Sequence, residues 1–186
     1  MTAADKPEFV RLRRQDKAVE DEAWIQALLE RAPVGVLAMV AGGQPFLNIN
    51  LFVYDPPAHA LYFHTAGEGR TRTNIERDPR VCFCVSEMGR LLPADTALEF
   101  SVEYASVIVF GRVRILTAED EARRALQLLL DKYAPHLRPG RDYRPITPDE
   151  IARTSVFCLD IERWSAKKNQ KPADFPGAFF YCPPRS

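Results

Sequence analysis

VGVLAMVAGGQPFLNINLFVY, residues 34–54, is the stretch that most constrains the fold. Residues 34–41 form a short, almost wholly apolar run, and residues 46–54 form a second run rich in aliphatic and aromatic side chains. The Gly42-Gly43 pair between the two runs supplies the positive φ that a tight hairpin turn needs. The stretch therefore predicts two antiparallel strands joined directly by a turn, with no room for a crossover helix.

The rest of the chain repeats this pattern of strands separated by turns. Further strands are predicted at residues 60–65, 81–86, 100–116 and 155–164 from their hydrophobic patterns and the turn residues around them. Apolar residues at helical spacing predict helices after Asp21, over 70–77 and over 120–133. About six strands joined mainly by hairpins predict a mainly β fold, a mostly antiparallel barrel with peripheral helices.

Length and composition restrict the function. The chain has 186 residues, with 25 Lys and Arg balanced by 25 Asp and Glu. We expect one domain over 21–167, an N-terminal arm over 1–20, and a C-terminal tail over 168–186 that packs on the domain or on a dimer partner. The balanced charge argues against nucleic acid as a partner, and the lack of a long apolar run argues against a membrane span. The polar start lacks a signal peptide's apolar segment, which predicts a cytoplasmic protein.

The reactive side chains give little support to metal or hydrolase chemistry. The four cysteines include no C-x-x-C pair, and no two of the three histidines have metal-ligand spacing. Cys82 and Cys84 are two apart on a predicted strand, which favours small buried thiols over a zinc site. No G-x-S-x-G motif surrounds Ser106. We therefore expect no metal site.

The predicted strand over 46–54 has two different faces, because side chains alternate along a strand. We expect its aliphatic face to line the barrel interior. The other face carries aromatic rings and amides, which favour a subunit interface or the wall of a planar ligand's site over a solvated surface. The aliphatic face consists of Leu47, Ile49, Leu51 and Val53, and the aromatic and amide face of Phe46, Asn48, Asn50, Phe52 and Tyr54.

The segment AGEGRTRTN, residues 66–74, has the composition of an anion site. Tyr62 and His64 share one face of the strand that leads into it. Its two glycines let backbone N–H groups approach an anion, and Arg70 and Arg72 lie where a helix begins. On the residues alone, a phosphate site and a solvated arginine-rich loop both remain open.

Two longer stretches carry a family resemblance. YFHTAGEGRTRTNIERDPRVCFCV, residues 62–85, and EYASVIVFGRVRIL, residues 103–116, resemble the FMN-binding split-barrel proteins of the pyridoxamine 5′-phosphate oxidase-like superfamily, nearest the nitroimidazole-resistance branch. The resemblance runs from about residue 11 to residue 167. It implies a six-stranded antiparallel split β-barrel, a homodimer, and FMN bound in a cleft shared by both subunits. Because it is to the broader superfamily, we do not expect pyridoxamine phosphate oxidation itself.

The resemblance also implies roles near the Gly-Arg segment. Arg70 matches a basic residue that binds the FMN phosphate. Thr71 stands where relatives often carry Lys, so Arg72 or the Thr71 hydroxyl would substitute for it. His64 and Thr65 match the strand end beside the flavin ring. His64 also matches a histidine of the nitroimidazole-resistance branch, which makes it the candidate catalytic residue.

Three candidates come from segments further along the chain. Ser106 belongs to a Tyr-x-Ser-Val segment, and Trp164 and Lys167 belong to a Trp-Ser-Ala-Lys ending that is similar to the family's Trp-Ser-Gly-Lys. The candidate cofactor-binding residues are thus Asn48, Asn50, Tyr62, His64, Thr65, Arg70, Thr71, Arg72, Ser106, Trp164 and Lys167.

The expected function is that of an FMN-dependent oxidoreductase that acts on a small organic molecule, with NAD(P)H as electron donor. Two alternatives remain open. One is a non-catalytic protein of the same fold that binds flavin, haem or deazaflavin for sensing or storage. The other is a barrel without a cofactor that serves only as an interaction protein, and Thr71 in the phosphate segment is the feature that supports it.

Overall fold

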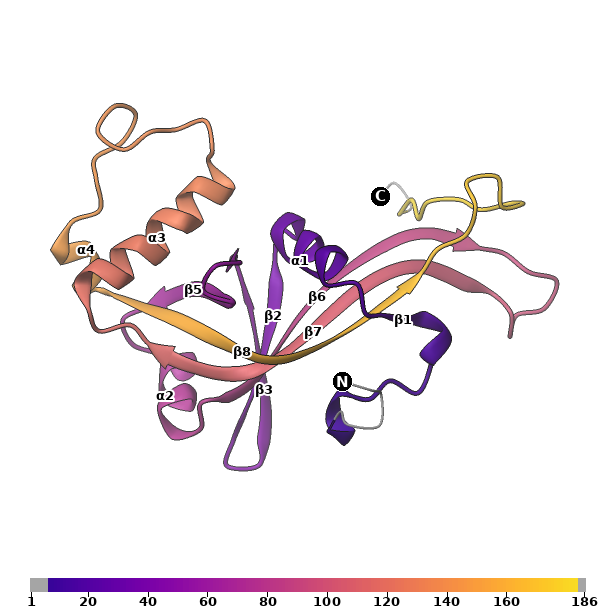
Figure 1. The fold of residues 1–186 in the computed structure, drawn as a ribbon, viewed down its shortest axis with the longest axis horizontal. Coiled ribbons are helices and arrows are strands. Elements are labelled where there is room, and N and C mark those ends of the chain that lie inside the picture. Colours follow the sequence, from indigo (N-terminus) through magenta and orange to yellow (C-terminus); the bar gives the residue numbers. More distant parts are fainter. Residues whose placement is uncertain (1–6, 184–186) are drawn as a thin grey trace.

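Within residues 7–183, which a computed structural model describes, the chain forms one eight-stranded sheet (Figure 1). Seven strands follow the hydrogen-bonded order β3-β2-β6-β7-β8-β5-β4, β1 pairs with β8, and every pairing is antiparallel. Residues 1–6 of the expected arm and 184–186 of the expected tail lie outside the described residues. The strands are β1 (Ala18–Val19), β2 (Gly35–Ala41), β3 (Gln44–Asn50), β4 (Val53–Asp55), β5 (Ala60–Ala66), β6 (Arg80–Leu92), β7 (Ser101–Ile115) and β8 (Thr154–Asn169).

Four α-helices lie around this sheet. They are α1 (Glu22–Arg31), α2 (Arg70–Arg77), α3 (Glu119–Tyr133) and α4 (Pro148–Ala152), and two 3₁₀ turns, Glu8–Val10 and Gln15–Lys17, precede β1. Asp21 caps α1 by accepting hydrogen bonds from the N–H groups of Ala23 and Trp24, as its position before the apolar stripe predicts. In the part of the chain that the structure describes, no helix is long and apolar enough to cross a membrane.

The mainly antiparallel β architecture confirms the predicted fold class, but eight strands replace the expected six. The run over 46–54 divides at Leu51-Phe52, where the chain leaves its pairing with β2 and begins to pair with β5. The second additional strand, β1, comes from the expected N-terminal arm. Long-range pairing decides both differences, and strand propensity does not report it.

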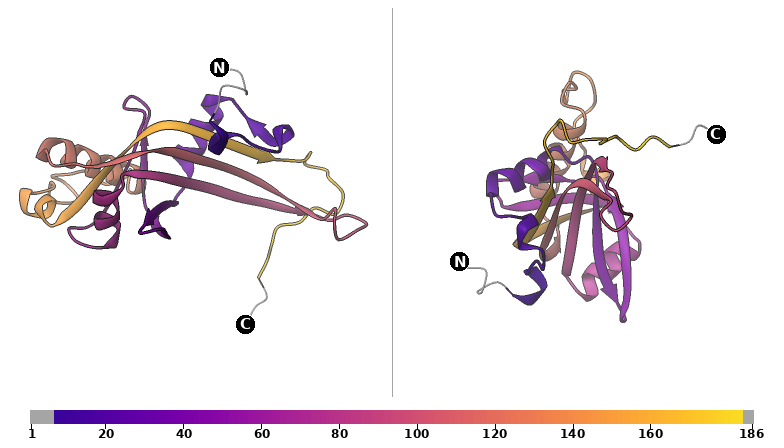
Figure 2. Two further views of the ribbon diagram at one scale, coloured as in Figure 1. Left: turned by 90° about the horizontal axis from the view of Figure 1, so that it is seen from below. Right: turned by 90° about the vertical axis from the view of Figure 1, so that its right-hand side faces the viewer.

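A long arm extends from the barrel. β6, β7 and the C-terminal half of β8 continue together beyond the barrel, and the chain after β8 folds back beside them (Figures 1 and 2). Arg90 holds this tail: its guanidinium forms an ion pair with Glu103 at 2.8 Å and donates to the carbonyl groups of Lys171, Pro172 and Ala173. The tail therefore has a defined path along the arm.

The predicted strand over 46–54 does not have its aliphatic face inside. Leu47 and Ile49 of β3 are 62% and 70% exposed, whereas Phe52, just after β3, and Tyr54 of β4 are 0% and 4% exposed. Val53 of β4 is the exception on the aliphatic face, because it is buried as expected. Large rings fill the barrel: Phe52 contacts Phe83 edge-to-face, with 4.9 Å between ring centroids. The aromatic face is inside because the volume of the barrel is filled by rings, and the aliphatic side chains are left on the opposite face.

The outward side chains form a continuous surface, which we call the outer face. Residues paired across neighbouring antiparallel strands point to the same side of a sheet, so the register defines its members. One row crosses five strands through Ile49, Val36, Cys84, Ile108 and Ser165, and the next through Leu47, Ala38, Cys82, Phe110 and Arg163. Most of these side chains are apolar, and Phe9 packs edge-to-face on Phe110 at one end.

Tyr133, the last residue of α3, connects this helix by hydrogen bonds to Phe52, which lies between β3 and β4. Its hydroxyl accepts from the Phe52 N–H at 3.0 Å and lies 2.8 Å from the Pro33 carbonyl oxygen, to which it donates. Lys132 donates to the Ala32 carbonyl at 2.8 Å, and its ammonium lies 4.0 Å from the centroid of the Phe52 ring.

We expect Tyr133→Phe to lower the free energy of unfolding by about 1–3 kcal/mol, because it leaves the Phe52 N–H without an acceptor in a partly buried position. Urea unfolding followed by circular dichroism measures this change. Tyr143→Phe is the matched control, because its hydroxyl accepts one hydrogen bond from the side chain of Gln127, and we expect it to cost less. Equal stability of Tyr133→Phe and the parent protein would contradict this role.

Candidate functional site

The loop between β5 and α2 is built around two glycines. The N–H of Gly67 donates to the Arg153 carbonyl at 3.0 Å, and a Cβ at this position would lie only 3.1 Å from that oxygen. Gly69 has φ 141°, a conformation that L side chains rarely adopt, and it precedes α2 without a side-chain cap. The first turn of α2 has no acidic residue. This N-terminus therefore presents backbone N–H groups and a positive dipole end to an anion.

Arg70 is the cation available at this N-terminus. Its side chain is exposed, and its guanidinium carbon lies 5.2 Å from the centroid of the Phe46 ring. It forms no ion pair with any residue between 7 and 183. The cation–π contact holds the side chain against the barrel without neutralising its charge.

Thr71 and Arg72, which we expected to complete the phosphate site, already have partners within the chain. Thr71 is buried, and its hydroxyl accepts from the Asn48 side chain at 3.0 Å. Arg72 pairs with Glu76 at 2.8 Å and donates to the Ser155 hydroxyl at 3.1 Å. The structure thus leaves Arg70 as the unpaired cation among the three expected phosphate ligands.

The two expected amides of β3 lie beneath the start of α2. Asn48 and Asn50 contact each other, with 3.3 Å between the amide nitrogen of Asn48 and the side-chain oxygen of Asn50. Asn50 is 6% exposed and donates to the Asn48 carbonyl at 3.1 Å. With Thr71 they form a hydrogen-bonded cluster on the inner side of the sheet, next to the N-terminus of α2.

His64 lies at the end of β5, in a cavity of about 540 Å³ between the barrel and α3. The residue is exposed, but the surrounding side chains partly desolvate its imidazole, and this burial lowers its pKa below the ordinary 6.5. Burial therefore favours the neutral form of the imidazole, whose unprotonated nitrogen is an acceptor. The other lining residues are Leu51, Leu126, Leu129, Leu130, Tyr133, Tyr143, Arg144, Ile146, Glu150 and Thr154.

Tyr62 and Thr65, the other candidates on β5, do not line this cavity. Tyr62 is 3% exposed and packs with α3, where its hydroxyl lies 3.4 Å from the Arg124 guanidinium. Thr65 donates its hydroxyl to the Ala66 carbonyl at 3.0 Å. Both residues support the strand that carries His64.

The structure separates the remaining candidates from Arg70. Ser106 and Lys167 are directly paired between β7 and β8 and point to the outer face. Lys167 also pairs with Ala18 of β1, where the extension formed by β6, β7 and β8 leaves the barrel (Figure 1). None of the cavities lined by Arg70 or His64 includes Ser106 or Lys167.

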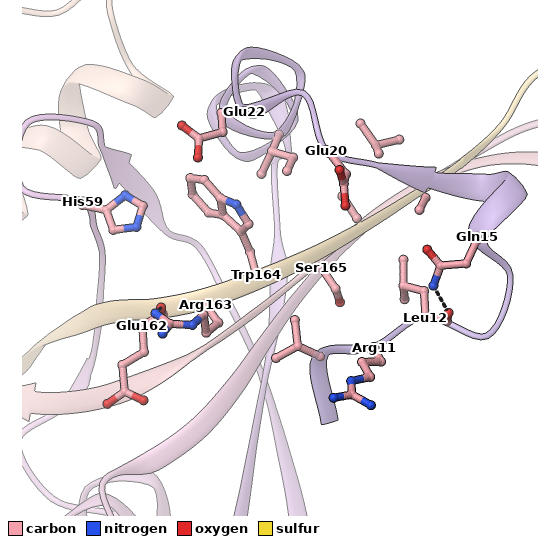
Figure 3. A pocket seen from close by; sticks show the side chains of 15 residues that line it. Arg11, Leu12, Gln15, Glu20, Glu22, His59, Glu162, Arg163, Trp164 and Ser165 are labelled. Carbon is pink, nitrogen blue, oxygen red and sulfur yellow. Dashed lines mark hydrogen bonds between the residues drawn. The ribbon is translucent and has the colours of Figure 1, made fainter. Parts of the chain in front are cut away.

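Trp164 points to the opposite side of β8, because its partner Val109 faces the core. It lines a cavity of about 480 Å³ beneath α1 and the N-terminal segment. Figure 3 shows its ring beside His59, with Glu22 above, and the two ring centroids are 4.8 Å apart. His59 is the only non-glycine residue with positive φ, 49°, in the described range 7–183.

Sequence reasoning missed the residues that enclose these sites. Three leucines of α3, Leu126, Leu129 and Leu130, line the His64 cavity. Their spacing in the sequence predicted only a helix that packs on the barrel. Asn74 and Arg77 line a further cavity of about 710 Å³ with Arg70. Their spacing from Arg70, four and seven residues along a predicted helix, was the available signal. Among the described residues, no group of three His, Cys, Asp or Glu side chains is placed to hold a metal ion.

The comparison of the sequence with known families decides the family. The sequence model of the pyridoxamine 5′-phosphate oxidase family matches residues 21–168, which include β2 to β8 almost entirely. The chain belongs to the pyridoxamine 5′-phosphate oxidase family. The family model therefore covers Arg70, His64 and the cavities around them. No curated protein matches the chain in sequence.

Solved structures share the fold of this pyridoxamine 5′-phosphate oxidase family member. The flavocytochrome Anf3 from Azotobacter vinelandii has a TM-score of 0.79 at 24% identity, over 97% of this chain and 89% of that chain. The FAD and heme binding protein from Mycobacterium smegmatis has a TM-score of 0.75 at 24% identity, over 83% of this chain and 74% of that chain. A Bacteroides thetaiotaomicron protein assigned to 5-nitroimidazole antibiotic resistance has a TM-score of 0.68 at 19% identity, over 81% of this chain and 86% of that chain. These likenesses confirm the split-barrel fold.

Proposed function

We propose that this chain is a flavin-dependent oxidoreductase that binds FMN through Arg70 and reduces or oxidises a small organic molecule, with NAD(P)H as electron donor. The observation that carries the proposal is the unpaired Arg70 guanidinium at an uncapped helix N-terminus that has no acidic residue. A phosphate there accepts from backbone N–H groups and from a guanidinium, and hydrogen bonds of this charge-assisted kind are stronger than those between neutral groups. Membership of the family and the flavin-binding relatives of the same fold support this choice of ligand.

The residues around Arg70 fit a planar ring attached to that phosphate. The hydrogen-bonded cluster of Asn48, Asn50 and Thr71 lies beside the phosphate site. His64 adds an imidazole near the end of β5, the strand that leads into the loop before Arg70, and burial lowers the pKa of this imidazole. When bound, FMN supplies the electron transfer. The role of the chain is to hold the phosphate, to orient the ring, and to offer His64 as a proton donor or acceptor beside the substrate.

A second copy of the chain completes this site. One chain leaves Ser106 and Lys167 on the outer face, away from Arg70, and leaves the apolar rows of that face open to solvent. Pairing two outer faces about a two-fold axis buries the apolar rows and adds the side chains of one copy to the flavin site of the other. We therefore propose a homodimer with a flavin site shared by both subunits.

The test is the absorbance of the purified protein with and without added FMN. We expect flavin absorbance to remain with the protein after gel filtration. Under anaerobic conditions NADPH or NADH should then bleach the bound flavin, and an organic acceptor should restore its colour. A protein that retains FMN but is not reduced by either nucleotide would favour a binding or sensing role, and a colourless protein would contradict flavin binding.

Haem in the His64 cavity is a second candidate, favoured by the chemistry of that cavity. Its walls are largely apolar, His64 is its only histidine, and the neutral imidazole is the form that binds iron. The flavocytochrome Anf3 and the FAD and heme binding protein share this fold. The one guanidinium at the cavity wall, Arg144, pairs with Glu150 of the same wall at 2.8 Å, so a propionate group would have to compete with this carboxylate.

Titration with haemin tests this candidate. We expect a Soret band that saturates at one haem per chain and is lost in His64→Ala. Binding should weaken as the pH falls through the lowered pKa of His64, because the proton then occupies the iron-binding nitrogen. His59→Ala, a change in a different cavity, should leave the band unchanged. If His64→Ala instead keeps the Soret band and loses flavin turnover at constant FMN affinity, His64 serves the flavin reaction.

A further inference from the structure

The walls of the His64 cavity are held in place by contacts within the chain. The cavity of about 540 Å³ lies between β5, α3 and the loop over 134–147, which leads from α3 to α4 (Figure 1). The side-chain amide of Gln127 donates to the Tyr143 hydroxyl at 2.9 Å, and the Arg123 guanidinium donates to the Ile146 carbonyl. Both contacts hold the loop against α3, so the chain forms this cavity without help from a ligand.

Most of the cavity surface is apolar. Of its eleven lining side chains, five are aliphatic and two are tyrosines. Two of the leucines, Leu51 and Leu130, are 51% and 36% exposed. A ligand with an apolar body removes this leucine surface from water when it enters the cavity, and this burial favours binding.

The charged side chains that line the cavity neutralise each other. Arg144 and Glu150 form an ion pair at 2.8 Å, and the remaining titratable side chain of low charge cost is His64, whose neutral form is favoured by burial. An anion in the cavity competes with Glu150 for the guanidinium, and a cation competes with Arg144 for the carboxylate. The wall therefore favours an uncharged ligand.

His64 supplies a polar group that has no partner in the described chain. The hydroxyl groups of Tyr133, Tyr143 and Thr154, which line the same cavity, all take part in hydrogen bonds within the chain. The imidazole of His64 makes no hydrogen bond or ion pair with any residue between 7 and 183. A neutral imidazole offers one N–H donor and one acceptor nitrogen. A ligand with an apolar body and one polar atom matches this arrangement.

We propose that this cavity holds the substrate and selects an uncharged, largely apolar ring compound with an oxygen or nitrogen that hydrogen-bonds to His64. The Arg144–Glu150 pair is the element that disfavours anionic compounds. The inference rests on the proposed flavin-dependent activity and names the class of its substrate. Haem, the second candidate for this cavity, carries two carboxylates and fits the neutralised wall less well.

The experiment compares two electron acceptors of the FMN-loaded protein, with NADPH or NADH as donor. 2,3-Dimethyl-1,4-naphthoquinone is uncharged, and 2-methyl-1,4-naphthoquinone-3-sulfonate has the same ring system with an anionic group. Each quinone takes up two electrons and two protons, which the reduced nicotinamide and one proton from water supply, and becomes the hydroquinone. We expect kcat/KM to be at least about tenfold higher for the uncharged quinone, because the sulfonate loses hydration against an apolar wall.

Glu150→Gln tests the ion pair. The variant keeps the cap of α4, because glutamine also completes a capping box with Thr147, but it leaves Arg144 without its carboxylate partner. We expect the preference for the uncharged quinone to fall about three- to fivefold, the size of effect typical of an exposed ion pair. Glu119→Gln is the matched control: it removes the carboxylate that pairs with Arg123 on α3, outside the cavity, and should leave the preference unchanged.

Leu130→Asp tests binding apart from turnover. In equilibrium dialysis of the FMN-loaded protein without donor, this variant should bind the uncharged quinone about tenfold more weakly, because it places a charge on the apolar wall. Leu98→Asp, a change at a 94% exposed position outside the cavity, should bind it as the parent does.

Three results would overturn the substrate site and leave flavin binding intact. They are a parent protein that prefers the anionic quinone, equal quinone affinities of Leu130→Asp and Leu98→Asp, and haemin bound at one per chain that the uncharged quinone does not displace. A protein that retains no flavin, or whose flavin is reduced by neither nucleotide, would overturn the proposed function itself.

Discussion

Arg70→Ala is expected to weaken FMN binding about ten- to a hundredfold, which corresponds to a loss of about 1.5–3 kcal/mol. The guanidinium has no acid partner in the described chain and lies at an uncapped helix N-terminus, so its removal leaves the phosphate with the backbone N–H groups alone. The exposed side chain contributes little to folding, and the melting temperature of the unliganded protein should change little.

Riboflavin is the control for this variant, because it has the same ring and no phosphate. Its affinity should be nearly the same for the parent and for Arg70→Ala when both are measured by fluorescence quenching. Arg70→Lys should bind FMN with intermediate affinity, since the ammonium keeps the charge but loses the bidentate geometry of the guanidinium. Equal losses for FMN and riboflavin would show that Arg70 does not contact the phosphate.

Ile49→Asp is expected to convert the proposed dimer into single chains. Ile49 is 70% exposed in one chain and occupies the edge of the outer face, so the substitution costs an isolated subunit little. In a dimer that buries this face, the carboxylate is desolvated without a partner, a cost of several kcal/mol that appears once in each subunit. We expect the dissociation constant of the dimer to rise at least about a hundredfold.

Light scattering at micromolar concentration measures this change. The parent should have twice the mass of the 21.1 kDa chain, and Ile49→Asp should have the mass of one chain. Leu98→Asp is the control, since Leu98 is 94% exposed in the loop between β6 and β7, off the outer face. Because the proposed flavin site is shared by both subunits, the single-chain variant should also bind FMN more weakly. A parent protein with the mass of one chain would contradict the dimer.

The local elements of this protein were predictable from short stretches of sequence. Gly42-Gly43 between two apolar runs specified the first hairpin, and both glycines have positive φ, 57° and 80°. The spacing after Gly69 specified α2, whose bounds, Arg70–Arg77, are those expected. Turn chemistry and side-chain periodicity act over a few residues, so the sequence carries them directly.

Tertiary structure alone decided which face of β3 is inside and which candidate residues are available to a ligand. Alternation showed that the two faces differ, but the inward face depended on Phe83, Phe63 and other rings from distant strands that fill the barrel with Phe52. The Thr71 hydroxyl accepts a hydrogen bond from the side chain of Asn48, 23 residues away. The Arg72 guanidinium donates to the hydroxyl of Ser155, 83 residues away. The contact of Arg70 with Phe46 and the apolar walls around His64 likewise depend on long-range packing. Such partners are fixed by volume and register across the whole sheet, and no local pattern in the sequence contains them.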